Sequence, residues 1–168
     1  DRSAQNMMPR ERLIVALDVD TKEKALGLVE KLKPEVKTFK IGSELFTSCG
    51  PDIVTAVKNA GCGIFLDLKF HDIPNTVAKS AIAATRLGVS ILNVHALGGY
   101  DMMKKCAMAV AMEAKALKIT KPKVIAVTVL TSMDENGLKK IGVSDSMEKQ
   151  VLKLAKLAKD ASLDGVVA

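Results

Sequence analysis

Charged side chains of opposite sign follow one another in a short segment near the middle of the chain. Asp67 and Lys69 are two residues apart, and Asp72 comes three residues later. Residues two apart on a strand point to the same side, so Asp67 and Lys69 share one face. Carboxylates beside a lysine keep it protonated, which allows the ammonium group to act as a general acid. This segment is the strongest candidate for catalytic chemistry.

Lys40 supplies a second cation from an earlier apolar run. If Phe39 and Ile41 face the covering helices, Lys40 points to the same interior as Asp67. Buried carboxylate and ammonium groups are costly unless they pair, so a purely structural ion-pair network is an alternative interpretation. The position of these charges near predicted strand ends favours catalysis, because β/α barrels carry their active sites there.

A repeat of short apolar runs and helical stretches must position these charges. The apolar runs, which predict strands, occupy residues 13–18, 38–42, 63–69, 91–95, 123–130 and 165–168. Helical periodicity separates them at residues 22–32, 51–60, 77–87, 101–117 and 146–161. Continuous apolar strands alternating with helices indicate a parallel sheet covered by helices.

An open doubly wound sheet and a closed barrel both fit this pattern. No GxGxxG or GxxxxGKS sequence follows a predicted strand, so the usual signature of the open nucleotide-binding sheets is missing. Polar residues end five consecutive predicted strands, namely Asp18, Lys40, Asp67 with Lys69, His95, and Thr131 with Ser132. A barrel gathers such ends around one cavity, whereas a flat sheet spaces its strands ~4.8 Å apart along a line. We therefore predict an α/β fold of the (β/α)8 TIM-barrel type, of which this chain shows about six β/α units.

The length and the polar start suggest how the chain is organised. Residues 1–12 are predicted to be a flexible N-terminal tail, and residues 13–168 a single barrel domain. Because a complete barrel has eight strands and typically ~250 residues, we expect this domain to be truncated before strands 7 and 8. The polar start holds no signal-type apolar segment, so export is not expected.

Composition narrows the classes of partner. Hydrophobic residues make up 48% of the 168 residues and charged residues 26%, as in ordinary globular proteins, and no apolar run could span a membrane. Three cysteines without a CxxC pair argue against a disulfide framework or a thiolate metal site, and fit a reducing cytoplasm. With one Tyr, four Phe and no Trp, the chain offers no stacking platform for nucleic acid. The net charge of +6 suits an anionic, phosphorylated substrate.

The segment DLKFHDIPNT at residues 67–76 resembles the signature of the orotidine 5′-monophosphate decarboxylase family. Further similarity follows the chain order, with ALD at 16–18, FKIG at 39–42, NVHALGG at 93–99 and VTVLTSM at 127–133. The resemblance covers essentially all of residues 12–168. It implies a carboxy-lyase that converts orotidine 5′-monophosphate to uridine 5′-monophosphate (UMP), the last step of de novo pyrimidine nucleotide synthesis, without a metal or another cofactor.

The resemblance also implies roles for individual residues. Lys40, Asp67, Lys69 and Asp72 resemble the family's alternating catalytic array, in which Lys69 protonates C6 of the pyrimidine and Asp67 lies against the departing carboxylate. Asp72, Ile73 and Thr76 resemble the segment that reaches the neighbouring subunit's site, which implies a homodimer. The implied substrate-binding residues are Asp18 at the ribose hydroxyls, Lys40, Asp67, Lys69, Asp72, Ile73, Thr76, and the strand-five pair Thr131 and Ser132.

Two alternatives stay open. A sister group of barrels, the decarboxylases of 3-keto-gulonate phosphate and the hexulose-phosphate synthases, resembles this chain at Asp67, Lys69 and Asp72 but uses Mg²⁺. That group has an acidic residue at the end of strand two, where this chain has Lys40, and Mg²⁺ prefers carboxylate oxygens to an ammonium group. The second alternative is a non-catalytic barrel fragment, which the loss of Lys69 or Asp72 would have supported.

Overall fold

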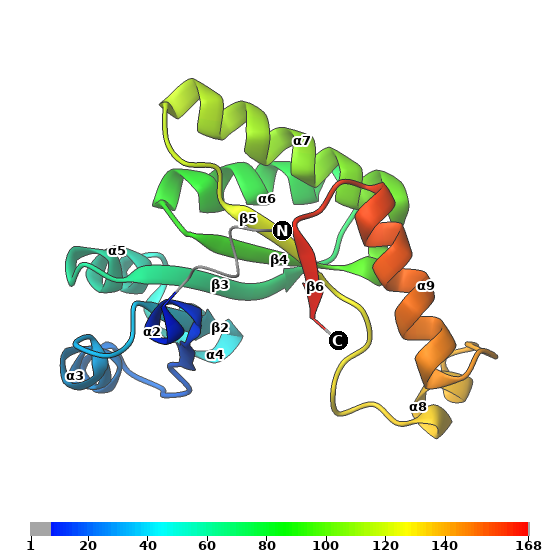
Figure 1. Cartoon of the computed structure of the whole chain (residues 1–168), viewed down its shortest axis with the longest axis horizontal. Helices are drawn as coiled ribbons and strands as arrows, with labels where there is room; N and C mark the ends of the chain where they lie inside the picture. Colours follow the sequence, from blue (N-terminus) through cyan, green and yellow to red (C-terminus); the bar gives the residue numbers. More distant parts are fainter. Residues whose placement is uncertain (1–7, 168) are drawn as a thin grey trace. The chain divides into compact units, whose positions relative to one another are not determined.

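The computed structural model of the chain describes residues 8–167. Its strands are β1 (Ile14–Ala16), β2 (Thr38–Gly42), β3 (Gly63–Phe70), β4 (Ile91–His95), β5 (Lys123–Val127) and β6 (Gly165–Val167) (Figure 1). Its helices are α2 (Pro9–Arg12), α3 (Lys22–Leu32), α4 (Ser43–Cys49), α5 (Asp52–Asn59), α6 (Pro74–Leu87), α7 (Gly99–Leu117), α8 (Glu135–Lys140) and α9 (Met147–Asp160), with a 3-10 turn, η1 (Ala96–Gly98). Strands therefore alternate with one or two helices, as the sequence predicts.

The hydrogen-bonded order of the strands follows the chain, from β1 to β6. Parallel register places Ala16 opposite Lys40 in the pair β1–β2, Gly42 opposite Asp67 in β2–β3, and Val127 opposite Val167 in β5–β6. A doubly wound sheet reverses its strand order at a switch point, whereas a β/α barrel keeps the chain order. The predicted fold class, a β/α barrel represented by about six units, is confirmed.

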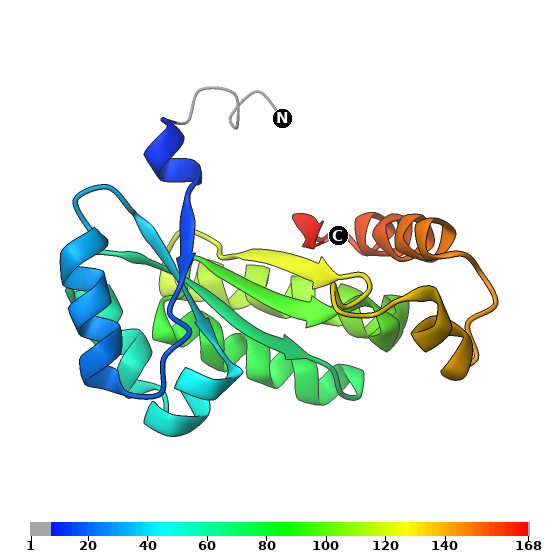
Figure 2. The same cartoon turned by 90° about the horizontal axis from the view of Figure 1, so that it is seen from below.

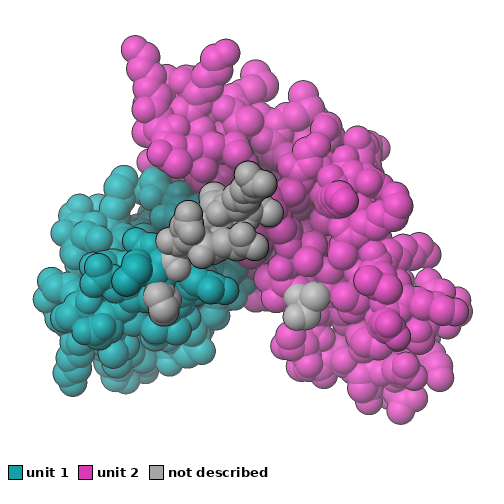
Figure 3. Space-filling view, in the orientation of Figure 1, with its two compact units in different colours: residues 1–68, 87–91 teal, residues 69–86, 92–168 magenta. Residues whose placement is uncertain are grey.

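The chain divides into two compact units (Figure 3). The first unit combines residues 1–68 with 87–91, and the second combines residues 69–86 with 92–168. One boundary falls inside β3, between Leu68 and Lys69. The organisation of residues 13–168 as a single domain stays a prediction.

In the first unit, buried and half-buried residues alternate along β2. Phe39 and Ile41 are fully buried, whereas Lys40 between them is only half-buried. Helix α4 packs against β2, and α3 and α4 both contact α5. Helix α3 begins after Thr21, whose side chain accepts a hydrogen bond from the Lys24 amide at 3.3 Å. The expectation that Phe39 and Ile41 face the core, which leaves Lys40 on the opposite face, is confirmed.

In the second unit, α6 and α7 run side by side along β4 and β5 (Figure 2). The Arg86 guanidinium joins them by an ion pair to Glu113 at 2.7 Å. Helix α9 packs against α7, β5, β6 and η1. Before β6, the Asp164 carboxylate accepts hydrogen bonds from the Val124 amide at 2.8 Å and from Lys121 Nζ at 2.6 Å. These bonds hold the entry of β6 against β5.

Two strands are shorter than predicted. Strand β1 ends at Ala16, although the Leu17 amide still donates to the Lys40 carbonyl at 2.9 Å. Strand β5 ends at Val127 although the apolar run continues to Leu130. The Thr128 amide and hydroxyl both donate to the Val167 carbonyl, and a turn closed from Met133 N to Leu130 O follows. The apolar run therefore leaves the sheet after Thr128, ahead of the turn that Leu130 and Met133 close.

Helices also differ from the prediction at several ends. The short helices α4 and α8 were not expected, because six or seven residues are too few to show a periodicity. Helix α6 begins at Pro74, three residues earlier than predicted, since proline is well suited to a first helical position. Of the predicted tail, residues 1–7 lie outside the described residues and Pro9–Arg12 forms α2. Ala168 of the sixth predicted strand also lies outside them.

Two further findings concern the chain as a whole. No helix in residues 8–167 is both long enough and apolar enough to cross a membrane. The three cysteines, Cys49, Cys62 and Cys106, are free thiols. Burial raises the pKa of the Cys106 thiol to about 12. This cysteine therefore packs as a small apolar residue of α7 and is not a reactive group at neutral pH.

Replacing Ile41 by Ala tests the packing of β2. Ile41 is 0% exposed, so the substitution leaves a cavity, and we expect the free energy of unfolding to fall by about 2–5 kcal/mol. Urea denaturation followed by circular dichroism measures the loss. Leu152→Ala on α9 is the control, because that side chain is exposed and its loss should change stability little. Equal losses in the two variants would contradict the proposed orientation of β2.

Candidate active site

Three of the predicted site residues meet in the first unit, around the ammonium group of Lys40. Lys40 Nζ is 3.3 Å from Asp67 Oδ2 and 3.7 Å from Asp18 Oδ1. Lys40 lies on β2 opposite Phe65 of β3, and Asp67 follows Phe65 by two residues, so both charges point to one face of the sheet. Asp18 comes two residues after the end of β1. The predicted meeting of Lys40 and Asp67 is confirmed, and Asp18 joins them.

The two carboxylates beside Lys40 differ in exposure. The side chain of Asp67 is 11% exposed and that of Asp18 is 75% exposed, with Lys40 between them at 27%. A charge attraction is stronger where water is excluded, so Lys40 mainly compensates the buried charge of Asp67. The exposed carboxylate of Asp18 keeps most of its oxygen surface available to a ligand's hydroxyl groups. This difference suits Asp18 for binding and Asp67 for electrostatics.

In the second unit, Lys69 has an unusual backbone near the end of β3. Its φ angle is +49°, in the left-handed region that side chains other than glycine rarely adopt. The Lys69 amide donates a hydrogen bond of 2.8 Å to Oδ1 of Asn93 on β4. Asn93 is 1% exposed, so the acceptor of this bond is buried, whereas Lys69 itself is half-buried. The structure therefore anchors the main chain of the predicted proton donor through a buried side chain.

Two histidines stack just beyond this bond. The rings of His71 and His95 have centroids 5.4 Å apart and an interplanar angle of 19°. The Leu97 amide donates to Nδ1 of His95 at 3.3 Å, so the neutral ring carries its proton on Nε2. Burial, and then the nearby His71 and Lys69, lower the pKa of His95. His95 is consequently neutral at pH 7, which supports the interpretation of a hydrogen-bonded histidine at a strand end.

The segment after β3 presents the next three predicted residues to solvent. Asp72, Ile73 and Thr76 are all exposed, and Ile73 is exposed to 67%. The Asp72 side chain accepts a hydrogen bond from the Ile73 amide at 2.6 Å. This bond shapes the turn before α6, whose first turn contains Thr76. An exposed isoleucine beside an exposed carboxylate is an arrangement that suits contact with another molecule.

Thr131 and Ser132 are not at the end of a strand, and that part of the prediction is wrong. They lie in the turn beyond β5, four and five residues after Val127, and both are exposed. The cause is the early end of β5, where Thr128 bonds to Val167. Their hydroxyl groups thus belong to a loop and not to the rigid sheet.

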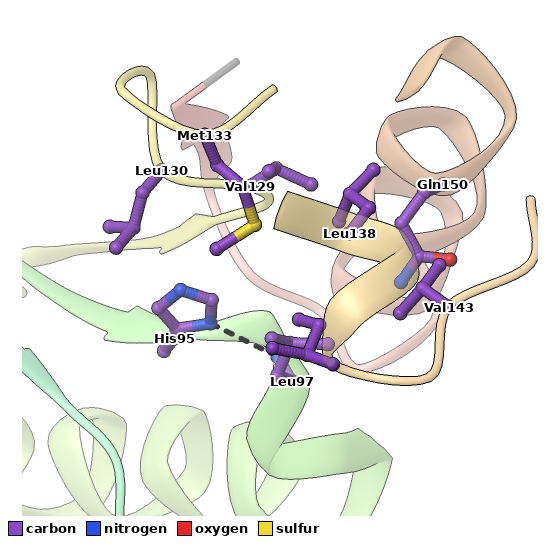
Figure 4. A pocket seen from close by; sticks show the side chains of 9 residues that line it. His95, Leu97, Val129, Leu130, Met133, Leu138, Val143 and Gln150 are labelled. Carbon is purple, nitrogen blue, oxygen red and sulfur yellow. Dashed lines mark hydrogen bonds between the residues drawn. The ribbon is translucent and has the colours of Figure 1, made fainter. Parts of the chain in front are cut away.

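A small pocket of about 110 Å³ lies beside the histidine stack (Figure 4). Its walls combine β4, the loop after β5, and helices α8 and α9, and they are almost entirely apolar. Figure 4 shows Met133 extending toward the space between His95 and Leu138. The lining residues are His95, Leu97, Val129, Leu130, Met133, Leu138, Ile141, Val143 and Gln150. Such walls accept a small apolar group and not a phosphorylated sugar, and Thr131 and Ser132 are not part of them.

Within residues 8–167, no cluster of three or more His, Cys, Asp and Glu side chains has a geometry that could hold a metal ion. The charged groups at the ends of β2 and β3 are instead an alternation of ammonium and carboxylate. Fixed charges of this kind can stabilise a charge that develops in a bound substrate.

Sequence reasoning missed the contribution of Asn93, although the motif that contains it was noted. A signal was present in the spacing. Asn93 and His95 are two residues apart on β4, and Lys69 near the end of β3 is likewise two residues before His71. Nothing in the sequence showed that the Asn93 side chain, and not a main-chain carbonyl, would receive the Lys69 amide.

Parallel strands in chain order, with a charged group at the carboxyl ends of β2 and β3, define a β/α-barrel protein with an active site of the strand-end type. The model of the Orotidine 5'-phosphate decarboxylase / HUMPS family matches residues 11–168. The chain belongs to this family.

Individual relatives agree with that assignment. The chain is 52% identical over 159 residues to the orotidine 5'-phosphate decarboxylase of Syntrophotalea carbinolica, covering 95% of the chain and 65% of that protein. It is 52% identical over 160 residues to the enzyme of the same name from Saccharophagus degradans, with the same shares covered. The crystal structure of orotidine 5'-phosphate decarboxylase from Lactobacillus acidophilus superimposes with a TM-score of 0.87 at 41% identity, over 95% of this chain and 71% of that one. The chain thus spans about 65% of the length of the curated relatives it matches.

Replacing Lys40 by Met tests the ion pair with Asp67. The substitution removes an ammonium group from beside a buried carboxylate, and we expect the free energy of unfolding at pH 7 to fall by about 1–3 kcal/mol. This range is below that of a fully buried pair because Lys40 is partly exposed. The double variant Lys40→Met/Asp67→Asn should recover most of the loss in the same urea titration.

Lys24→Met is the matched control for this experiment. Lys24 pairs with Asp20 at 2.7 Å, but both side chains are more than half exposed, so the substitution should change stability little. A Lys40→Met variant as stable as Lys24→Met would show that Asp67 does not depend on Lys40.

Proposed function

We propose that the complete protein carrying this chain is a carboxy-lyase that converts orotidine 5′-monophosphate to UMP, in the synthesis of pyrimidine nucleotides. The observation that carries the proposal is the contact of Lys40 with Asp67, with Lys69 two residues further along the same strand. The family match over residues 11–168 and the names of the relatives support the same reaction.

The reaction assigns a separate task to each charged residue. Asp18 binds the ribose hydroxyl groups, for which its exposed carboxylate is suited. Asp67 lies against the substrate carboxylate. The bond from C6 to that carboxylate breaks, CO₂ leaves, and the electron pair stays on C6. Lys69 Nζ then donates its proton to C6 and becomes a neutral amine.

The rate enhancement comes from charges that are fixed before the substrate binds. The carbanion at C6 has no adjacent carbonyl group over which its charge could spread, so it must be stabilised electrostatically. Lys40 helps to hold Asp67 in place without reorganisation, because the two groups already pair in the free protein. Thr131 and Ser132 contact the substrate from the loop after β5, with the Ser132 hydroxyl near the pyrimidine. Binding energy from the remote phosphate contributes to lowering the barrier.

The proposed reaction uses no metal ion or cofactor. The rival function is that of the Mg²⁺-dependent sugar-phosphate barrels, which share Asp67, Lys69 and Asp72 with this chain. The ammonium group of Lys40 lies 3.3 Å and 3.7 Å from the carboxylates that Mg²⁺ would need as ligands. A positive side chain at that position competes with a cation for the same oxygens. The contact of Lys40 therefore favours the metal-free reaction.

We further propose that the enzyme is a homodimer in which Asp72, Ile73 and Thr76 complete the neighbouring subunit's site. The exposure of all three residues supports this, since an apolar side chain exposed to 67% gains most from burial against a partner. A cytoplasmic location is part of the proposal and rests on the three free cysteines. The scarcity of aromatic residues argues against nucleic acid as a partner.

Turnover of orotidine 5′-monophosphate by the complete gene product tests the proposed reaction. With a chelator present, we expect steady loss of substrate absorbance and release of CO₂. Lys69→Ala should lower kcat by at least about 10²–10⁴-fold, because it removes the proton donor. Lys79→Ala, which removes an exposed lysine of α6, is the matched control and should leave kcat unchanged.

Two outcomes would reject parts of this proposal. No turnover by the folded wild-type protein, with or without Mg²⁺, would remove the reaction itself. Full activity of Lys69→Ala would remove the role of Lys69 while leaving the reaction in place.

Mixing inactive subunits tests the shared site. Asp72→Asn and Lys69→Ala subunits should each be inactive, but a heterodimer contains one site with both residues intact. Random exchange in a two-fold dimer should therefore restore about a quarter of the wild-type activity. The control mixes Lys69→Ala with Asp67→Asn, which leaves a defect in every site and should restore nothing. Equal results from the two mixtures, after subunit exchange has been demonstrated by mass spectrometry, would contradict the shared site.

A further inference from the structure

The main chain at Lys69 departs from the strand conformation of its neighbours. Strand β3 is extended over most of Gly63–Phe70, yet φ of Lys69 is +49°. For a residue with a Cβ atom this conformation is unfavourable, and it persists only where surrounding contacts impose it. Among the described residues, Lys118 and Ser162 are the other non-glycine residues with positive φ, and both lie just beyond the ends of helices, where left-handed residues are common. Lys69 lies in a strand.

One contact that imposes this conformation comes from Asn93. Oδ1 of Asn93 accepts the Lys69 amide at 2.8 Å, from a side chain that is 1% exposed. In a regular parallel ladder this amide would donate to a main-chain carbonyl of the neighbouring strand. A side-chain oxygen need not lie where a main-chain carbonyl of the neighbouring strand would lie. It can therefore accept from the amide of a residue whose backbone departs from the ladder geometry. A buried amide without an acceptor would be strongly disfavoured.

A second link holds the same two segments together. His71 and His95 stack at 5.4 Å, and they are separated by 24 residues, the same separation as Lys69 and Asn93. The chain leaving β3 is thus attached to the end of β4 at two successive positions on one face. The Leu97 amide orients His95 in turn, through Nδ1. Lys69 is therefore flanked by a fixed contact at its own amide and another two residues later.

We propose that Asn93 is a positioning residue for Lys69, which holds the lysine backbone in the left-handed conformation that aims its ammonium group. This inference rests on the proposed function, because it concerns the lysine that protonates C6. The direction of the Cα–Cβ bond sets where a long, flexible side chain can place its terminal atom. A displacement of about 1 Å in a reacting group can lower a rate about 10²-fold. Asn93 acts through the Lys69 amide, whose hydrogen bond its Oδ1 accepts.

Two structural measurements test whether Asn93 holds the Lys69 backbone, without reference to turnover. In the wild-type protein, hydrogen exchange at the Lys69 amide should be as slow as in the core of the ladder, since its acceptor is buried. A crystal structure of Asn93→Ala should show φ of Lys69 outside the left-handed region. Rapid exchange in the wild type, or an unchanged φ near +49° in Asn93→Ala, would overturn the proposal whatever the activity.

Kinetics of the complete gene product test the consequence for catalysis. Asn93→Ala should lower kcat by about 10–100-fold and change KM less than about threefold, since binding groups stay in place. Asn93→Asp should recover most of that loss, because it keeps an Oδ1 acceptor at the same position. Recovery by Asp is not expected if Asn93 only fills space, since a buried carboxylate is the worse filler.

Thr85→Ala is the matched control for a loss of buried hydrogen bonding. Thr85 is 0% exposed, and its hydroxyl donates to the Ala81 carbonyl at 2.8 Å within α6. This variant should lose stability with an unchanged kcat. An equal fall of kcat in Thr85→Ala and Asn93→Ala would reduce Asn93 to a structural role and overturn the proposal. Absence of turnover by the wild-type protein would reject only the proposed function. The exchange rate of the Lys69 amide and the φ angle of Lys69 test the role of Asn93 independently.

Discussion

Asp67 places a carboxylate where only 8% of the residue is exposed, and a buried charge requires partners that are fixed in position. Lys40 provides one of them at 3.3 Å, and it can do so because parallel register puts both residues on the same face of neighbouring strands. That geometry depends in turn on Phe39 and Ile41, whose complete burial on the opposite face leaves β2 no freedom to turn over. Hydrophobic packing behind the strand therefore holds the charge pair in front of it.

Around the ends of β3 and β4, neutral hydrogen bonds and ring stacking hold the chain. The Lys69 amide is held by Asn93, and the neutral ring of His95 receives the Leu97 amide and stacks on His71. The lowered pKa of His95 has a structural meaning here, because protonation at Nδ1 would remove the acceptor that the Leu97 amide uses. Polar groups without net charge thus hold the main chain of Lys69 and the ring of His95. A few charged groups held in place by neutral polar groups are an arrangement that can stabilise a developing charge electrostatically.

Several exposed residues are available for contact with other molecules. Asp18 presents a carboxylate, Ile73 an apolar side chain, and Thr131 with Ser132 two hydroxyl groups on a loop. The apolar pocket beside His95 has a different character, since its walls contain hardly any polar group. In the loop after β5, Leu130 and Met133 line the pocket, whereas Thr131 and Ser132 between them are exposed.

The sequence by itself determined the β/α succession, the alternation in β2 and β3, and the pairing of Lys40 with Asp67, because all three follow from local periodicity and from the pleat of a strand. It also carried the family resemblance, which the comparisons confirmed. Only the tertiary structure decided that β5 stops at Val127, since strand pairing depends on β6, whose Val167 lies 39 residues after Thr128. The left-handed backbone of Lys69 was likewise hidden, because the acceptor that stabilises it belongs to Asn93, 24 residues away. Periodicity reports what neighbours in the chain share, whereas these features depend on partners that only folding brings together.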